Sequence, residues 1–292
     1  MRVSNNTPPQ LLSLGALGDA YGFCFEFVEP AFVHSFNDLS YHQHPEFTTV
    51  TPGRYSDDTQ MQLGLAELLI QEGSDWSPLK VADQFVSVYK RDPRPGYAKR
   101  FRCLLDEVSC GQELLTRLNP QSERNGAAMR ASVIGLLPGL ELVKHLTALQ
   151  ASVTHNTSGG IDSAIASALI CHYFRFISPN TQELPDFLSD HIPTHDWYTP
   201  WQGRVPVHGI STVQAALTAL RSSSSLSQIL KRCISFTGDV DSVATIACSC
   251  SAVNDQIRKD LPTNLWTNLE NTSYGLNYLQ KIDKRLHSAS LP

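Results

Sequence analysis

The chain has 292 residues and a hydrophobic content of 41%, so it is long enough to bury a large core and too apolar for intrinsic disorder. Lysine and arginine number 23 against 28 aspartates and glutamates, which gives a net charge of -5. We therefore expect no general affinity for nucleic acids, because such affinity depends on basic residues that neutralise phosphates.

Membrane and secretion signals are not visible in the sequence. No run approaches the roughly 18 apolar residues that span a bilayer, and the first residues carry no apolar signal segment. The 7 cysteines form no C-x-x-C pair, a usage typical of buried thiols in a reducing compartment. We expect a globular protein of the cytoplasm without a membrane partner.

Apolar residues recur at helical spacing along most of the chain. Spacings of three and four residues place each set on one face of a helix. The sets are Leu11, Leu14 and Gly18; Met61, Leu65, Leu68 and Leu69; Leu79, Ala82, Val86 and Tyr89; Met129, Val133, Leu136 and Leu137; Ile161, Ile165, Ala168 and Leu169; Val213, Ala216, Leu217 and Leu220; and Val243, Ile246, Ala247 and Cys250. Alternation with period two is scarce, so the sequence predicts an all-α protein of about ten or more helices.

The chain shows no linker and no internal repeat, so we expect a single domain over residues 1–292. The least regular part, residues 178–206, contains five prolines together with Trp197, Tyr198 and Trp201. We expect an irregular surface excursion there. Such loops are often functional, and a merely decorative insertion is the alternative.

Two acidic clusters each stand directly before a predicted helix. They are Ser56-Asp57-Asp58-Thr59 and Asp239-Val240-Asp241-Ser242. Helix capping explains either cluster alone, since Ser and Asp accept the free N–H groups of a first turn. Paired acids in both clusters exceed what capping needs. Four carboxylates with adjacent hydroxyls are hard oxygen ligands for Mg²⁺, Mn²⁺ or Ca²⁺, and facing clusters would hold two ions.

Three other segments contain candidate functional residues. Glu26 lies between two phenylalanines, which would raise its pKa and suit an acid/base role; an exposed residue at a helix end is the alternative. Residues 122–126 form a polar turn whose free N–H groups are a candidate phosphate cradle. His155 precedes the helix of Ile161, and a single histidine is more often a satisfied polar residue than a ligand.

Taken in order, these segments resemble the ADP-ribosylglycohydrolase family, which includes the dinitrogenase reductase-activating glycohydrolases. The resemblance extends from about Leu11 to Trp266. The matching segments are Gly18-Asp19-Ala20 with Glu26, Ser56-Asp57-Asp58-Thr59, Asn125-Gly126-Ala127-Ala128-Met129-Arg130, Thr154-His155, residues 209–217, and Gly238-Asp239-Val240-Asp241-Ser242. The resemblance implies a compact, orthogonal, all-α bundle of many helices with two Mg²⁺ ions in a cleft, Mn²⁺ being an alternative ion.

The resemblance also implies an activity and the residues that perform it. The expected reaction is hydrolysis of the glycosidic bond between ADP-ribose and an acceptor. The implied metal ligands are Ser56, Asp57, Asp58, Asp239, Asp241 and Ser242. The implied catalytic groups are Glu26, Asp57, Asp58 and Asp241. Substrate would be bound by Ser122, Glu123, Arg124, Asn125 and Gly126 near the pyrophosphate and by His155 near the ribose and phosphate.

The sequence departs from the family pattern at three positions. Ser242 stands where threonine is usual, and it still offers a hydroxyl oxygen. Thr237 stands where a second glycine is usual. Arg124 lies near the position where some members stack an aromatic ring on adenine, and a guanidinium plane also stacks.

Several functions stay open at this point. The resemblance favours ADP-ribosyl-arginine on a protein as substrate, with ADP-ribosyl-serine, ADP-ribosylated nucleic acid or a small ADP-ribose metabolite as alternatives. A non-catalytic ADP-ribose-binding or structural relative is a second hypothesis, although the complete set of carboxylates favours an enzyme. A two-metal phosphoesterase would use the same aspartates but would leave residues 122–126 unexplained.

Overall fold

A computed structural model describes residues 10–288 of the chain. The α-helices are α1 (Leu11–Phe23), α2 (Pro30–Phe36), α3 (Asp57–Glu72), α4 (Pro78–Arg91), α5 (Lys99–Glu107), α6 (Gly111–Arg117), α7 (Gly126–Met129), α8 (Leu140–Ser152), α9 (Ser158–His172), α10 (Leu184–His191), α11 (Gly209–Arg221), α12 (Leu226–Ser235), α13 (Val240–Ser251), α14 (Thr263–Asn268) and α15 (Leu276–Ser288). Two 3₁₀ helices, η1 (Ala131–Leu136) and η3 (Thr181–Glu183), and a π-helix, η2 (Tyr173–Ile177), complete the set.

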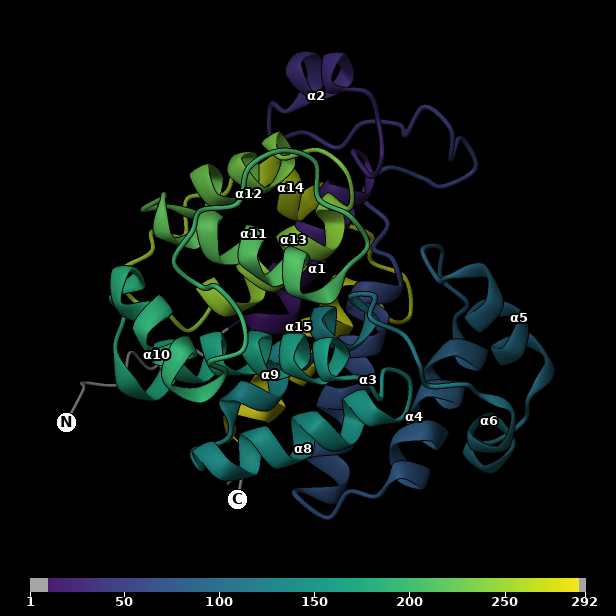
Figure 1. Ribbon diagram of the computed structural model, residues 1–292. Helices are drawn as coiled ribbons and strands as arrows, with labels where there is room; N and C mark the ends of the chain where they lie inside the picture. The colour runs from purple at the N-terminus through teal and green to yellow at the C-terminus, as the bar shows by residue number, and fades with distance from the viewer. Residues whose placement is uncertain (1–9, 289–292) are drawn as a thin grey trace.

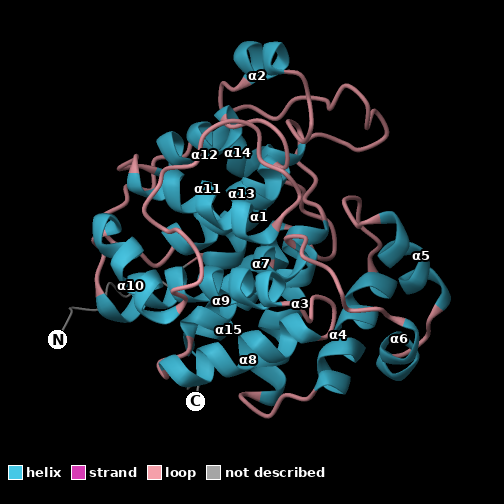
Figure 2. Ribbon diagram, viewed as in Figure 1, coloured by secondary structure: helices cyan, strands magenta, loops and turns pink. Residues whose placement is uncertain are grey.

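The described residues contain helices and loops but no β-strand, as Figure 2 shows. Extended residues pair only in isolated bridges, such as the one between Val205 and Gly238. The predicted all-α fold is therefore confirmed. No helix within residues 10–288 combines the length and the apolar content that crossing a membrane requires.

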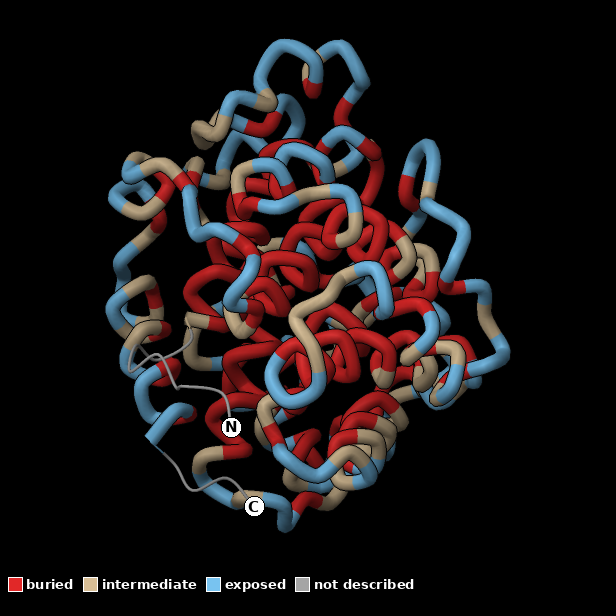
Figure 3. The backbone as a smooth tube through the Cα atoms, turned by 90° about the vertical axis from the view of Figure 1, so that its left-hand side faces the viewer, coloured by how far each residue is buried: buried red, intermediate tan, exposed pale blue. Residues whose placement is uncertain are grey.

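Helices α1 and α13 form the centre of the molecule (Figure 1), and every residue of both is buried. A helix without a polar face needs neighbours on all sides, and Figure 3 shows this buried interior beneath exposed loops. Two glycines let α1 approach α13 closely. A Cβ atom at Gly18 would lie 2.5 Å from the Ala244 carbonyl oxygen, and one at Gly22 would lie 2.4 Å from the Asp241 Cα. The end of α1 is thereby placed beside the start of α13.

The start of α1 is held by the C-terminal helix α15. Helix α1 has no side-chain N-cap of its own. The buried Asp283 of α15 supplies one, because its carboxylate accepts hydrogen bonds from Leu12 N at 2.9 Å, Ser13 N at 3.1 Å and Ser13 Oγ at 2.7 Å. These bonds satisfy free N–H groups of the first turn and join the first described helix to the last one.

Peripheral helices flank this core. Helix α2 and the loop that follows it lie at the top of Figure 1, and α4, α5 and α6 lie at its right side. The apolar stripe from Met129 to Leu137 does not form the single α-helix that its spacing predicted. Helix α7 ends at Met129, and the 3₁₀ helix η1 carries the chain onward to Leu136.

The segment 178–206 is more regular than expected. It contains η3 and α10, and Pro185 lies in the first turn of α10, where a missing N–H has no helical partner to lose. Leu184, Leu188 and Trp197 are buried in the core. Because these side chains pack inward, part of the segment belongs to the folded body, and only its remaining loops form an excursion.

Candidate active site

The two acidic clusters meet at one site around the end of α1. Carboxylate oxygens of Glu26, Asp239 and Asp241 all lie within 4.8 Å of one another. Burial raises the pKa of Asp58 of α3 well above its ordinary value, and the charge of Asp239, directly before α13, is near enough to raise it further. Folding therefore brings together acidic groups that lie far apart in the sequence.

A buried carboxylate on α1, Asp19, holds the start of α3. Its oxygens accept hydrogen bonds from Ser56 N at 3.0 Å, from Thr59 N at 2.9 Å and from Thr59 Oγ1 at 2.6 Å. The Ser56 hydroxyl in turn accepts the Asp58 N–H at 3.2 Å and caps α3. Capping is thus done by Ser56 and Asp19, which leaves the carboxylates of Asp57 and Asp58 for another task. Asp19 lies in the Gly18-Asp19-Ala20 segment that resembles the family, but it was not among the predicted site residues.

At the start of α13, capping does not explain the acidic cluster. Asp239 occupies the N-cap position but makes no side-chain cap hydrogen bond. Its Oδ2 instead accepts a hydrogen bond from Asn125 Nδ2 at 3.1 Å, and the same amide nitrogen lies 3.2 Å from Thr212 Oγ1. Asn125 was expected to contact substrate; in the structure its side chain positions Asp239.

Glu26 is held in place through its backbone. The His44 Nδ1 accepts the N–H groups of Glu46 and Phe47 at 3.0 Å each, so its Nε2–H donates to the Glu26 carbonyl at 2.8 Å. The next residue, Phe27, donates its N–H to the Gly238 carbonyl at 2.9 Å and has a φ of 54°. Glu26 is thus fixed between the loop after α2 and the loop before α13. His44 was not recognised in the sequence, because nothing there shows which loop it contacts.

The electrostatics of the site disfavour ionised carboxylates. Burial, followed by the negative charges of Asp239 and Asp19, raises the pKa of Glu26 to about 8. Burial, reinforced by neighbouring acids, also raises the pKa of Asp57, Asp58 and Asp241 well above the ordinary value. Within residues 10–288, no lysine or arginine forms an ion pair with these groups. The cluster therefore has no ion-paired lysine or arginine among the described residues, and the more distant charge of Arg124 offsets only part of the effect of burial on the pKa of Asp239.

The donor set fits a hard divalent cation. Asp58 Oδ2 and Asp241 Oδ1 are buried and have no hydrogen-bond partner among the described residues. A buried carboxylate oxygen without a partner is costly, and a cation would satisfy it. Oxygen-only ligands of this kind suit Mg²⁺ or Mn²⁺, and the residues that could hold the ion are those of the two acidic clusters with Glu26.

The predicted substrate loop, residues 122–126, lies next to this cluster. The Asn125 bond to Asp239 joins the two, and the ring of His155 lies against Gly126, where a Cβ atom would be 3.0 Å from His155 Cε1. Ser122 stays within the loop, where its Oγ accepts the Arg124 N–H at 3.2 Å. Glu123 and Arg124 are exposed. The structure thus buries Asn125 and His155, with Gly126 beside the His155 ring. It places Glu123 and Arg124 at the surface.

The loop before α13 contains a strained residue. Thr237 has a φ of 64°, a conformation that a β-branched side chain rarely adopts. Backbone bonds fix it there, since Val205 N donates to the Thr237 carbonyl and Asp239 N donates to the Val205 carbonyl, both at 3.0 Å. The left-handed conformation explains why glycine is usual at this position in the resembled family. These bonds also connect the end of segment 178–206 to the site.

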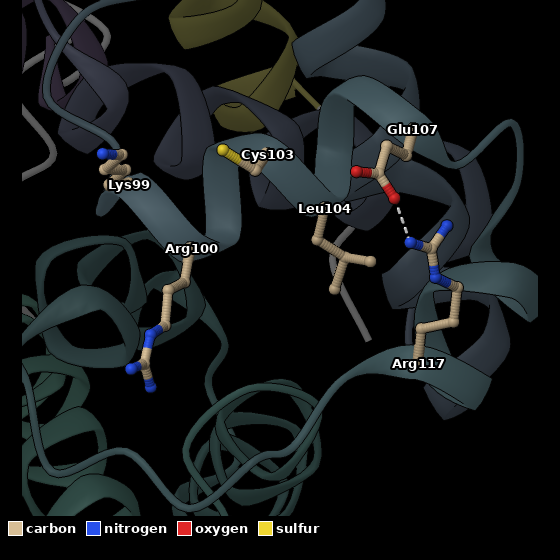
Figure 4. Close-up of a pocket in the computed structure, with 6 residues that line it drawn as sticks. All are labelled: Lys99, Arg100, Cys103, Leu104, Glu107 and Arg117. Atoms are coloured by element: carbon tan, nitrogen blue, oxygen red, sulfur yellow. Dashed lines mark hydrogen bonds and ion pairs between the residues drawn. The ribbon is translucent and has the colours of Figure 1, made fainter.

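A pocket of about 480 Å³ lies elsewhere, between α5 and α6 (Figure 4). It is lined by Lys99, Arg100, Cys103, Leu104, Glu107 and Arg117, and an ion pair between the last two closes one side. None of the predicted site residues lines it, so it is separate from the acidic cluster.

Replacing Thr237 with glycine is expected to stabilise the protein. Relief of the strained φ outweighs the extra flexibility of the unfolded chain, so the free energy of unfolding should rise by about 1 kcal/mol. Urea denaturation measures this change. The matched control is Thr116→Gly in α6, which should lower stability by a few tenths of a kcal/mol, about the difference in helix propensity between threonine and glycine. Equal destabilisation by both variants would contradict the strain at Thr237.

Comparisons with known proteins show which proteins this chain is similar to. Three similar proteins, each named "ADP-ribosylhydrolase ARH3", come from Xenopus tropicalis (28% identical over 147 residues), Mus musculus (32% over 172) and Homo sapiens (32% over 172). The aligned segments cover 47%, 53% and 53% of this chain and 41%, 45% and 46% of those proteins, so the chain spans about half the length of the curated relatives it matches.

A solved structure described as "ADP-ribosylglycohydrolase-related protein complex" shares the fold with a TM-score of 0.70 at 19% identity, over 96% of this chain and 97% of that one. The family model described as ADP-ribosylglycohydrolase matches residues 11–290, nearly the whole chain. This protein therefore belongs to the ADP-ribosylglycohydrolase family.

Proposed function

We propose that the protein is a Mg²⁺-dependent hydrolase that cleaves the glycosidic bond between ADP-ribose and an acceptor. The observation that supports it most directly is the pair of buried carboxylate oxygens of Asp58 and Asp241, which have no hydrogen-bond partner among the described residues and lie in a cluster that forms no ion pair with lysine or arginine there. Family membership supplies the substrate class, and the substrate loop beside Asp239 is consistent with a phosphate-containing ligand.

Glu26 is the group best suited to move a proton. In the ion-free protein the Glu26 carboxyl has a pKa of about 8, and a bound cation would lower that pKa toward neutrality, which suits a group that holds and releases a proton in general acid/base catalysis. The backbone bonds of His44 and Phe27 fix the position of the Glu26 main chain. Bound Mg²⁺ would supply charge that orients the ribose and polarises the reacting sugar. The transition state of such a hydrolysis carries oxocarbenium character, which the surrounding carboxylates would stabilise.

The acceptor is proposed by resemblance alone. ADP-ribosyl-arginine on a protein is the first candidate, followed by ADP-ribosyl-serine, ADP-ribosylated nucleic acid and small ADP-ribose metabolites. A cytoplasmic location and a second Mg²⁺ ion also stay predictions. A panel of these substrates, assayed with Mg²⁺ and with excess chelator, would rank the acceptors.

Removing one charge from either cluster is expected to abolish activity. Asp57→Asn and Asp241→Asn should each reduce Mg²⁺-dependent release of ADP-ribose by at least about 100-fold, because each removes a charged ligand from the site. The control is Asp75→Asn, whose carboxylate is 87% exposed and should leave the rate unchanged. Full activity of the wild-type protein in excess chelator would contradict the role of the metal.

Two other outcomes would identify the alternative functions. Binding of ADP-ribose in calorimetry without turnover of any substrate in the panel would support a non-catalytic relative. Release of inorganic phosphate in place of free ADP-ribose would support the phosphoesterase.

The stability of the ion-free protein is expected to fall as the pH rises. Glu26 has a pKa of about 8 in the folded protein against an ordinary 4.5, so between these values the folded state holds a proton that the unfolded chain has lost. The free energy of unfolding should therefore be greatest near pH 4.5 and should decline as the pH rises toward about 8.

Mg²⁺ should reverse this trend, because it binds the ionised carboxylates. At the upper end of the range, saturating Mg²⁺ should raise Tm by roughly 5 °C or more, since 1 kcal/mol moves Tm by about 2–4 °C in a domain of this size. Differential scanning calorimetry with and without Mg²⁺ measures both effects. A Tm that is independent of Mg²⁺ across the range would count against the proposed ion site.

A further inference from the structure

Arg130 is a buried cation whose guanidinium is held by neutral groups. It lies directly after α7 and is 1% exposed. Its Nε donates to Gln150 Oε1 at 2.6 Å, and its Nη2 donates to the Gln150 carbonyl at 3.2 Å. The Gln150 amide is itself fixed, because its Nε2 donates to the Ala127 carbonyl at 3.1 Å, and the guanidinium lies 4.3 Å from the centre of the Phe85 ring. The direction of the guanidinium is therefore determined by the core.

The same guanidinium reaches the residue before His155. Arg130 Nη2 donates a second hydrogen bond to Thr154 Oγ1 at 2.7 Å, and Thr154 Oγ1 lies 2.6 Å from His155 Nδ1. Arginine is only a donor, so the Thr154 oxygen accepts from Arg130 and keeps one proton to give. Among the described residues, His155 Nδ1 is the one acceptor within reach of that proton.

This chain of donors decides which nitrogen of His155 carries the hydrogen. Burial, followed by the charges of Arg130 and Arg124, lowers the pKa of His155 to about 3, so the ring is neutral at physiological pH. If the Thr154 hydroxyl donates to Nδ1, the proton of the neutral ring is on Nε2. The positive charge of Arg130 polarises the hydroxyl and strengthens this arrangement.

The opposite tautomer would be less well satisfied. With a proton on Nδ1, the Thr154 oxygen would accept from both neighbours, and its own hydrogen would have no partner in the described structure. The Nε2 atom of His155 makes no hydrogen bond within residues 10–288 and lies beside Gly126, where a Cβ atom would be 3.3 Å away. A free N–H at this position faces the substrate loop.

We propose that Arg130, acting through Thr154, fixes His155 as the Nε2–H tautomer, so that His155 is a hydrogen-bond donor to an oxygen of the substrate's phosphate or ribose. Arg130 and Thr154 are positioning residues, since both are buried and act through His155. The proposal rests on the proposed function for the identity of the ligand. The other tautomer would present a lone pair, which repels a phosphate oxygen.

The tautomer is measured directly by nuclear magnetic resonance on the whole protein labelled with ¹⁵N-histidine. Long-range ¹H–¹⁵N correlations show which ring nitrogen carries the proton, and the His155→Gln spectrum assigns the signals. We expect Nε2 protonated and Nδ1 unprotonated between about pH 5.5 and 8. A proton on Nδ1, or a ring that is charged at neutral pH, would overturn the proposal.

Calorimetry with ADP-ribose in the presence of Mg²⁺ measures how much the Thr154 hydroxyl contributes, through His155, to ADP-ribose binding. Thr154→Val should weaken ADP-ribose binding by about 3- to 10-fold, the range expected for one neutral hydrogen bond. The matched control, Thr154→Ser, keeps the hydroxyl and should bind within about twofold of wild type. In a His155→Ala background, Thr154→Val should have no further effect, because its influence passes through the imidazole.

An equal loss on Thr154→Val in both backgrounds would show a merely structural role and would contradict the relay. A different result would refute the proposed function. A wild-type protein that neither binds nor releases ADP-ribose would refute the proposed activity, while the tautomer measured in the free protein would still test the relay.

Discussion

The mutual repulsion of buried carboxylates is the constraint on which the rest of the structure depends. Glu26, Asp239 and Asp241 lie within 4.8 Å of one another, and Asp57 and Asp58 add to the same field. Folding removes these groups from water, and the described chain offers them no ion-paired cation. Protons or a divalent cation must therefore balance the charge, and a structure that maintained such a cluster for stability alone would do better with apolar side chains.

The architecture holds this unfavourable cluster together through rigid backbone contacts. Glycines 18 and 22 bring α1 against α13, and Asp19 ties the start of α3 to the same helix. The strain at Thr237 is tolerated because its carbonyl accepts the Val205 N–H and the Asp239 N–H donates to the Val205 carbonyl. Sites that need precise geometry are better built on helices than on loops, and here the acidic groups come from helix starts that are fixed to the buried centre. The relay from Arg130 extends the same design to the substrate loop.

The spacing of apolar residues predicted much of the fold. The sequence predicted the position of the acidic cluster but not the contacts that hold it in place. The stripes at α1, α3, α9, α11 and α13 predicted those helices, because their buried faces repeat every three to four residues. Pairs of acids before two helices predicted where the cluster would form. Asp19 was noted only as part of a segment that resembles the family, and His44 was not noted at all, because the roles of both depend on contacts between distant segments. The role of Asn125 in substrate binding, implied by the resemblance, stays a prediction, while its bond to Asp239 was not foreseen because it spans 114 residues and has no local signal. The sequence also showed Thr237 as a departure from the family, but only the backbone angle explains it.

The central claim is that the two acidic helix starts exist to bind divalent cations. Anomalous X-ray diffraction from crystals grown with Mn²⁺ tests it most directly, since that signal locates the metal without reference to activity. The account predicts Mn²⁺ bound between Asp57 and Asp58 on one side and Asp239 and Asp241 on the other. Crystals with no Mn²⁺ at these carboxylates, or with Mn²⁺ bound elsewhere on the protein, would contradict it.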